Sequence, residues 1–124
     1  MCQDLGPHAD GRSPVAGLAK PQGAKSTCHI WIASFEGERA RVSRKRFCEA
    51  LRRHEAPFHV GYTKRAAYQH PVFRKAFPKG AYRKGLCPNA ERMVPRMVMG
   101  DPMVPMKEAE RAADALAAAI REVR

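Results

Sequence analysis

About 18 consecutive apolar residues are needed to cross a lipid bilayer, and the sequence has no such run, because charges interrupt its longest apolar stretch near the C-terminus. It also has no apolar N-terminal segment of the kind found in secretory signals. Its four cysteines are scattered and form no C-x-x-C pair. These absences exclude the membrane-spanning class, and we expect a soluble cytoplasmic protein whose thiols are reduced.

Acidic residues are few in this chain. Twelve Asp and Glu stand against 23 Lys and Arg, which gives a formal net charge of +11. Such an excess favours anionic partners, including nucleic acid, although it says nothing about the fold. At 124 residues the chain has room for one domain with one modest core, so a complete two-domain enzyme does not fit.

The first 26 residues are rich in Gly, Pro, Ala, Ser and Lys and show neither the period of a strand nor that of a helix. Such a stretch buries too little apolar surface to order itself. We therefore expect residues 1–26 to be a flexible arm and residues 27–124 to be the folded domain.

Three segments have the patterns of strands. Residues 28–35 are rich in β-branched and aromatic side chains, and residues 58–62 alternate between apolar and polar. A third short apolar run covers residues 97–99 before a glycine. Between the second and third segments, residues 63–86 mix basic and aromatic residues in what we expect to be a long, partly ordered loop.

Two segments predict the main helices. Ser43 is a good N-cap, and the apolar positions after it share one helical face to about His54. Residues 106–124 repeat apolar side chains at three and four positions. Shorter helices are expected at 71–77 and from Pro88 onward. The fold class is thus α/β, specifically an α+β small domain with a short, mainly antiparallel sheet of about three strands against two main helices.

Four local motifs occur in a fixed order along this domain. They are His29-Ile30-Trp31-Ile32 in the first strand, Arg46-Phe47-Cys48-Glu49-Ala50-Leu51 in the first helix, Gly61-Tyr62 followed by Tyr68-Gln69-His70-Pro71-Val72-Phe73-Arg74, and Cys87-Pro88-Asn89-Ala90-Glu91-Arg92. In this order they resemble the C-terminal small domain of the DegT/DnrJ/StrS-type aminotransferases, which depend on pyridoxal phosphate (PLP). The aromatic segment is similar to that of the branch acting on inososes in aminocyclitol biosynthesis.

The resemblance covers roughly residues 27–124 and implies a function. The family transfers an amino group, usually from glutamate or glutamine, to a keto-sugar or keto-cyclitol. Its Schiff-base lysine, the carboxylate facing the pyridine nitrogen and the phosphate cup belong to the large domain, because PLP must be held in a fixed orientation. We expect no catalytic residue in this chain and no PLP bound by it alone. The implied partners are a large aminotransferase domain or a second copy, since the family forms homodimers.

A lysine that acts as a nucleophile requires an apolar pocket or a cationic neighbour that lowers its pKa. All lysines of this chain stand in polar or loop contexts: Lys20, Lys25, Lys45, Lys64, Lys75, Lys79, Lys84 and Lys107. This supports the expectation that the chain does not transaminate alone.

Four residues are candidates for the substrate cleft, because the matching family segment lies near the mouth of the active site. They are Tyr62, Tyr68, His59 and His70. The alternative for the tyrosines is ordinary packing at the end of a strand, and the alternative for the histidines is a solvated position. Both alternatives stay open at the level of sequence.

A second class of function rests on the basic residues of the long loop. They alternate with aromatic residues, as in proteins that contact the phosphates and stack on the bases of single-stranded nucleic acid. The candidates for this polyanion site are Lys64, Arg65, Arg74, Lys75, Lys79, Arg83 and Lys84. The alternative is a solvated loop, since no known RNA-binding motif is present.

No metal site is expected. A zinc site built from Cys28, His29, Cys48 and Cys87 would lack the short paired spacing of zinc motifs. Glu91 and Arg92 fit a solvated helix face, and no pair of carboxylates stands out for acid–base chemistry.

Overall fold

The structure, a computed structural model, describes residues 12–18, 22–25, 29–61, 63, 65–78, 81–100 and 104–124. The elements follow one another as β1 (Val15–Gly17), β2 (Trp31–Phe35), α1 (Gly37–Ala40), α2 (Arg44–Arg53), β3 (Phe58–Val60), the 3₁₀ helix η1 (Ala67–Gln69), α3 (Pro71–Ala76), α4 (Pro88–Met93), the 3₁₀ helix η2 (Val94–Arg96), β4 (Met97–Gly100) and α5 (Met106–Val123). Within the described residues, no helix is long and apolar enough to span a membrane.

The strands form one antiparallel sheet in the order β1-β2-β4-β3. Because β4 runs antiparallel to both of its neighbours, β2 and β3 are parallel to each other, and α2 connects them. The predicted fold class, an α+β domain with an antiparallel sheet and two main helices, is confirmed. The sheet has four strands in place of the three expected.

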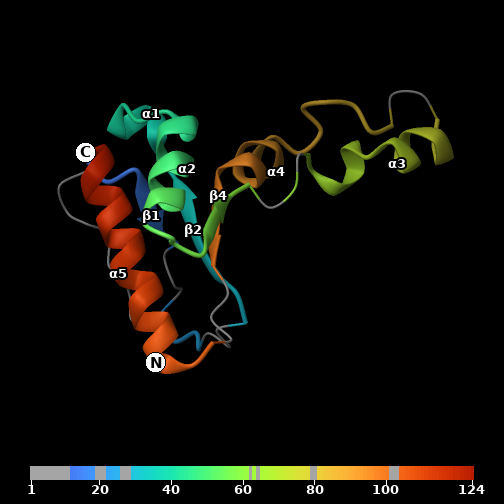
Figure 1. The fold of residues 1–124 in the computed structure, drawn as a ribbon. Helices are drawn as coiled ribbons and strands as arrows, with labels where there is room; N and C mark the ends of the chain where they lie inside the picture. The colour runs from blue at the N-terminus through green and yellow to red at the C-terminus, as the bar shows by residue number, and fades with distance from the viewer. Residues whose placement is uncertain are drawn as a thin grey trace.

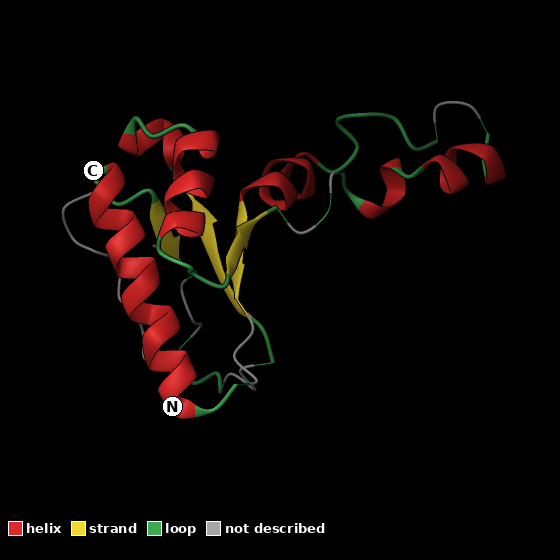
Figure 2. Ribbon diagram, in the orientation of Figure 1, coloured by secondary structure: helices red, strands yellow, loops and turns green. Residues whose placement is uncertain are grey.

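Both long helices lie on one face of the sheet (Figures 1 and 2). On α5 the side chains of Leu116, Ala119 and Val123 recur at spacings of three and four and are buried. They meet α2 and the inward side chains of the strands in one core. The most deeply buried of its side chains are Ala33, Phe47, Ala50, Val98, Leu116, Ala119 and Val123.

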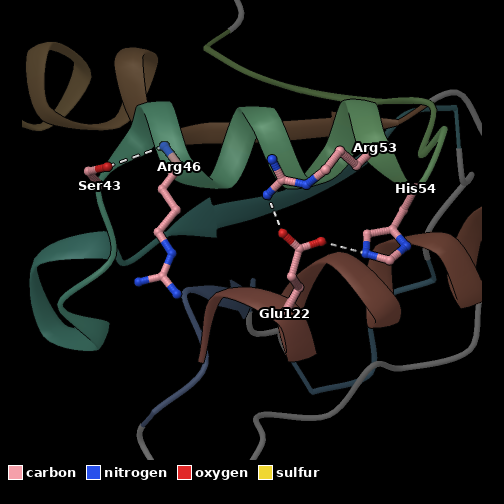
Figure 3. A network of polar contacts seen from close by, with 5 residues as sticks. All are labelled: Ser43, Arg46, Arg53, His54 and Glu122. Carbon is pink, nitrogen blue, oxygen red and sulfur yellow. Dashed lines mark hydrogen bonds and ion pairs between the residues drawn. The ribbon is translucent and has the colours of Figure 1, made fainter.

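Helix α2 begins as the sequence predicts. The Ser43 hydroxyl accepts a hydrogen bond from the Arg46 amide at 3.2 Å and so satisfies one of the free N–H groups of the first turn (Figure 3). Its last turn is joined to α5 by Glu122, which forms an ion pair with Arg53 and contacts His54 Nε2 at 2.8 Å (Figure 3). Polar contacts therefore stabilise the outer edge of a helix pair whose inner faces are apolar.

Gly100 allows two aromatic rings to meet at one end of the sheet, where β2 and β3 begin and β4 ends. It stands opposite Trp31 on β2 and Phe58 on β3. The two rings pack edge to face with centroids 5.2 Å apart. A methyl group on Gly100 would overlap the Phe58 ring, so this position requires a residue without Cβ.

Strand β1 differs from the expectation of a flexible arm over residues 1–26. Val15 pairs with Phe35 and Gly17 with Ala33, and the Glu36 amide extends the ladder to the Pro14 carbonyl at 2.7 Å. Pairing with β2 orders this segment together with the burial of Pro14 and the packing of Val15 against the core. The expectation is wrong for residues 12–18, while residues 1–11 lie outside the described part of the chain.

Candidate functional site

The candidate site is the connection from β3 to α4, here called the extension (residues 65–87). It contains η1 and α3, and α3 lies beyond α4, away from the sheet and the two long helices (Figure 1). The short helix predicted over 71–77 is confirmed as α3, whose first residue is Pro71. The extension carries most of the site residues that the sequence analysis selects.

Tyr68 and Glu91 hold the base of the extension. The Tyr68 hydroxyl donates a hydrogen bond to the Glu91 carboxylate and accepts one from the Cys87 amide at 3.2 Å. Glu91 also accepts a hydrogen bond from the Gly85 amide at 2.6 Å. Since Tyr68 is in η1 and Glu91 in α4, these bonds join the two ends of the extension.

These contacts shift the pKa values of both groups. The hydrogen bond from Tyr68, followed by that from the Gly85 amide, lowers the pKa of Glu91, and the nearby charge of Lys84 lowers it further. Loss of hydration raises the pKa of Tyr68, and its hydrogen bond to Glu91 adds to this effect. A charged carboxylate and a neutral phenol are therefore the stable pair at neutral pH.

Three aromatic rings cluster on the extension, and one of them, Tyr82, also lies 6.4 Å from the ring of Tyr68. Phe77 packs edge to face on Tyr82 with centroids 4.9 Å apart, and Phe73 lies 6.0 Å from Tyr82. Phe73 and Phe77 themselves are nearly parallel, with centroids 6.5 Å apart. The cluster is not a closed core, because Phe73 is 38% and Phe77 45% exposed.

The basic residues of the proposed polyanion site are distributed along the extension. Those whose side chains the structure describes are all exposed: Arg65, Lys75, Arg83 and Lys84. Lys64, Lys79 and the side chain of Arg74 lie outside the described part. The structure therefore places four exposed cations on the same projecting segment as the aromatic cluster.

The cleft candidates are not brought together in the described structure. Tyr68 is half-buried and bound to Glu91. His59 is exposed on β3, and His70 is exposed at the start of α3. Tyr62 lies outside the described residues.

Glu91 is the residue that sequence reasoning missed. It was expected on a solvated helix face; it is half-buried there, and its carboxylate accepts hydrogen bonds from the Tyr68 hydroxyl and the Gly85 amide. A signal was present in the motif that begins at Cys87, where a carboxylate follows three residues after the helix-starting Pro88. An acidic side chain in a first turn can bind free amides before it, as Glu91 does with Gly85.

The described lysines do not fit a PLP site. The Schiff-base nitrogen needs an apolar pocket or a cationic neighbour, whereas the described lysines are exposed: Lys25, Lys45, Lys75, Lys84 and Lys107. No step of an amino transfer is therefore assigned to them. The described residues also contain no group of three His, Cys, Asp or Glu that could hold a metal ion, and Cys48 and Cys87 are free thiols.

Comparisons of this chain with models of known protein families, with curated proteins and with solved structures found no match. The resemblance to the aminotransferase small domain therefore stays a prediction from the sequence.

Proposed function

We propose that this chain acts as the small domain of a PLP-dependent aminotransferase for a keto-sugar or keto-cyclitol, together with a large domain that supplies the lysine. One observation carries the proposal. The two segments with the most specific resemblance, around Tyr68 and around Cys87–Arg92, are held together by the hydrogen bond from Tyr68 to Glu91. One residue from each motif, Tyr68 and Glu91, thus takes part in the same contact.

The fold is consistent with such a role. The four-stranded sheet with both long helices on one face forms the main domain, and the extension projects from one end of it (Figure 2). In the proposed enzyme the main domain, meaning the sheet and its two long helices, packs on the large domain. The extension reaches the mouth of the active site. There it excludes water and shapes the pocket for the keto substrate.

The role of the chain is therefore positional. Its described lysines are exposed, so the large domain must contribute the covalent chemistry of PLP, which serves as an electron sink when bound. The hydrogen bonds of Tyr68 and Glu91 hold the two ends of the extension together.

A split-enzyme experiment tests the proposal. The full chain is co-expressed with the large domain of a keto-cyclitol aminotransferase from which the C-terminal domain has been removed. We expect a stable complex and transfer of the amino group from glutamate, measured as 2-oxoglutarate release, with neither part active alone. Tyr68→Phe should weaken the activity more than Tyr82→Phe, because only the first removes the anchor to Glu91.

Locating the lysine that binds PLP shows which results would contradict the proposal. After borohydride reduction, mass spectrometry should find the PLP adduct on the large domain. A specific, saturable adduct on one lysine of this chain would contradict the assignment of a non-catalytic small domain. Absence of both complex and activity with large domains that act on keto-sugars and keto-cyclitols would overturn the proposal itself.

A further inference from the structure

The charge of the extension is of one sign. No Asp or Glu occurs between Glu55 and Glu91, whereas this interval contains seven Lys and Arg. The four whose side chains are described are exposed, and no ion pair within the described residues neutralises them. A positive potential without internal compensation attracts an anionic ligand.

Glu91, the carboxylate at the base of the extension, offsets this potential only in part, because it is one negative charge beside four exposed cations. It is occupied by the Tyr68 hydroxyl and the Gly85 amide. Of the basic side chains in the extension, Lys84 is the one whose charge affects the pKa of Glu91. Lys75 and Arg83 are thus left facing solvent.

Exposed aromatic rings accompany these cations. Phe73 and Phe77 are each more than one-third exposed, and Tyr82 contacts both of them. Rings fixed by their neighbours yet open to solvent offer faces on which planar groups stack. Anionic protein surfaces have few planar groups that stack on aromatic rings. Every nucleotide has a planar base together with an anionic phosphate.

A second copy of this chain is not the favoured occupant, because two such extensions would repel each other. We propose that the extension binds single-stranded nucleic acid, with phosphates on Lys75, Arg83 and Lys84 and bases stacked on Phe73 and Phe77. This activity goes beyond the proposed aminotransferase role and does not depend on it.

Binding is measured by fluorescence anisotropy with the full chain and a labelled oligothymidylate of about 12 nucleotides, within the site sizes of single-strand binders. We expect the logarithm of the association constant to fall with the logarithm of salt concentration by about 0.7 per phosphate contact. The triple variant Lys75→Gln/Arg83→Gln/Lys84→Gln should reduce that slope by about 2.

Two further variants separate charge from stacking. Lys45→Gln/Arg52→Gln/Lys107→Gln removes the same charge from exposed sites on α2 and α5 and should leave the slope within about 0.7 of the original value. Phe77→Leu should weaken binding at least about fivefold without changing the slope, because it removes a stacking face but no charge.

Base-free and peptide probes decide the class of ligand. An abasic strand of the same length should bind at least about fivefold more weakly than oligothymidylate, since it cannot stack. Equal binding of the two strands, tighter binding of an oligoglutamate peptide, or an equal loss in both triple variants would overturn the proposal. None of these outcomes affects the split-enzyme result, which is read from complex formation and amino transfer.

Discussion

The Tyr68 hydroxyl donates a hydrogen bond to the Glu91 carboxylate, which joins a 3₁₀ turn to a helix 23 residues later in the chain. The same hydroxyl accepts the Cys87 amide at 3.2 Å. The extension between these residues is therefore a closed loop with a defined base rather than an open connection. Tyr82 links this base to the other rings, since its centroid lies 6.4 Å from that of Tyr68 and 4.9 Å from that of Phe77.

The first prediction concerns this base. Tyr68→Phe keeps the ring but removes the acceptor of the Cys87 amide and a donor to Glu91. We expect the Cys87 and Gly85 amides to exchange with solvent about three- to tenfold faster, since their hydrogen bonds protect them locally. Amide hydrogen exchange followed by NMR measures both residues individually.

Tyr82→Phe is the control, because it removes a hydroxyl from a neighbouring ring of the extension and leaves the Tyr68 contacts in place. The thermal midpoint should change little in either variant, since the base lies outside the main core. Unchanged protection of Cys87 in Tyr68→Phe would show that the hydroxyl does not hold the loop.

The second prediction concerns Gly100. An alanine at this position overlaps the Phe58 ring, so we expect Gly100→Ala to lower the free energy of unfolding by about 1–3 kcal/mol, as overpacked cores do. Urea denaturation measures the change. Adding Phe58→Leu should recover part of the loss. The double variant should then lose less free energy of unfolding than the two single variants lose together. If the losses in free energy of unfolding of the two single variants simply add in the double variant, Gly100→Ala does not act through overlap with Phe58.

The third prediction concerns the start of α2. Ser43→Ala leaves the Arg46 amide without its cap and should cost about 1 kcal/mol of stability. Ser43→Asp keeps an acceptor in the same place and should differ from the original protein by only a few tenths of a kcal/mol. Thermal unfolding followed by circular dichroism compares the three proteins. Equal midpoints for serine and alanine would mean that the cap contributes nothing.

The fourth prediction is a pH dependence. The hydrogen bond from Arg53, followed by that from His54, lowers the pKa of Glu122 below its ordinary value of 4.5. A carboxylate with a lowered pKa in the folded state adds stability that is fully present above the ordinary value and is lost as the pH falls through the lowered one. We therefore expect Glu122→Gln to flatten the decline of the thermal midpoint below pH 4.5.

Glu110→Gln is the matched control for that experiment, because it makes the same change at an exposed carboxylate of α5. Its acid curve should follow that of the original protein. If Glu122→Gln also follows that curve, the contact between α2 and α5 does not respond to the charge of Glu122.

Much of the main domain is predictable from local pattern. Ser43 as N-cap, the helix beginning at Pro88 and the long C-terminal helix all rest on features of a few adjacent residues. On α5, however, Ala113 is exposed, while Ala119 is fully buried. Alanine is small enough for either environment, so its periodicity specifies a helix better than it specifies a face.

Features that depend on distant partners were not predictable. Strand β1 is ordered by backbone hydrogen bonds to β2 and by the burial of Pro14 and Val15, and neither the pairing partner nor this burial follows from a three-residue pattern. Glu91 resembles any surface glutamate until Tyr68, in another segment, is placed against it. In both cases the decisive contact joins residues that the sequence separates by about 20 positions.

The strand order has a consequence for how the chain folds. The sheet pairs Trp31 with Gly100, and the helix layer pairs Arg53 with Glu122. Because such remote contacts form slowly and only after both partners have been synthesised, the sheet cannot close before β4 emerges from the ribosome. Until α5 follows, the apolar side of α2 that packs on it remains uncovered, and exposed apolar surface of this kind makes a nascent intermediate prone to aggregate.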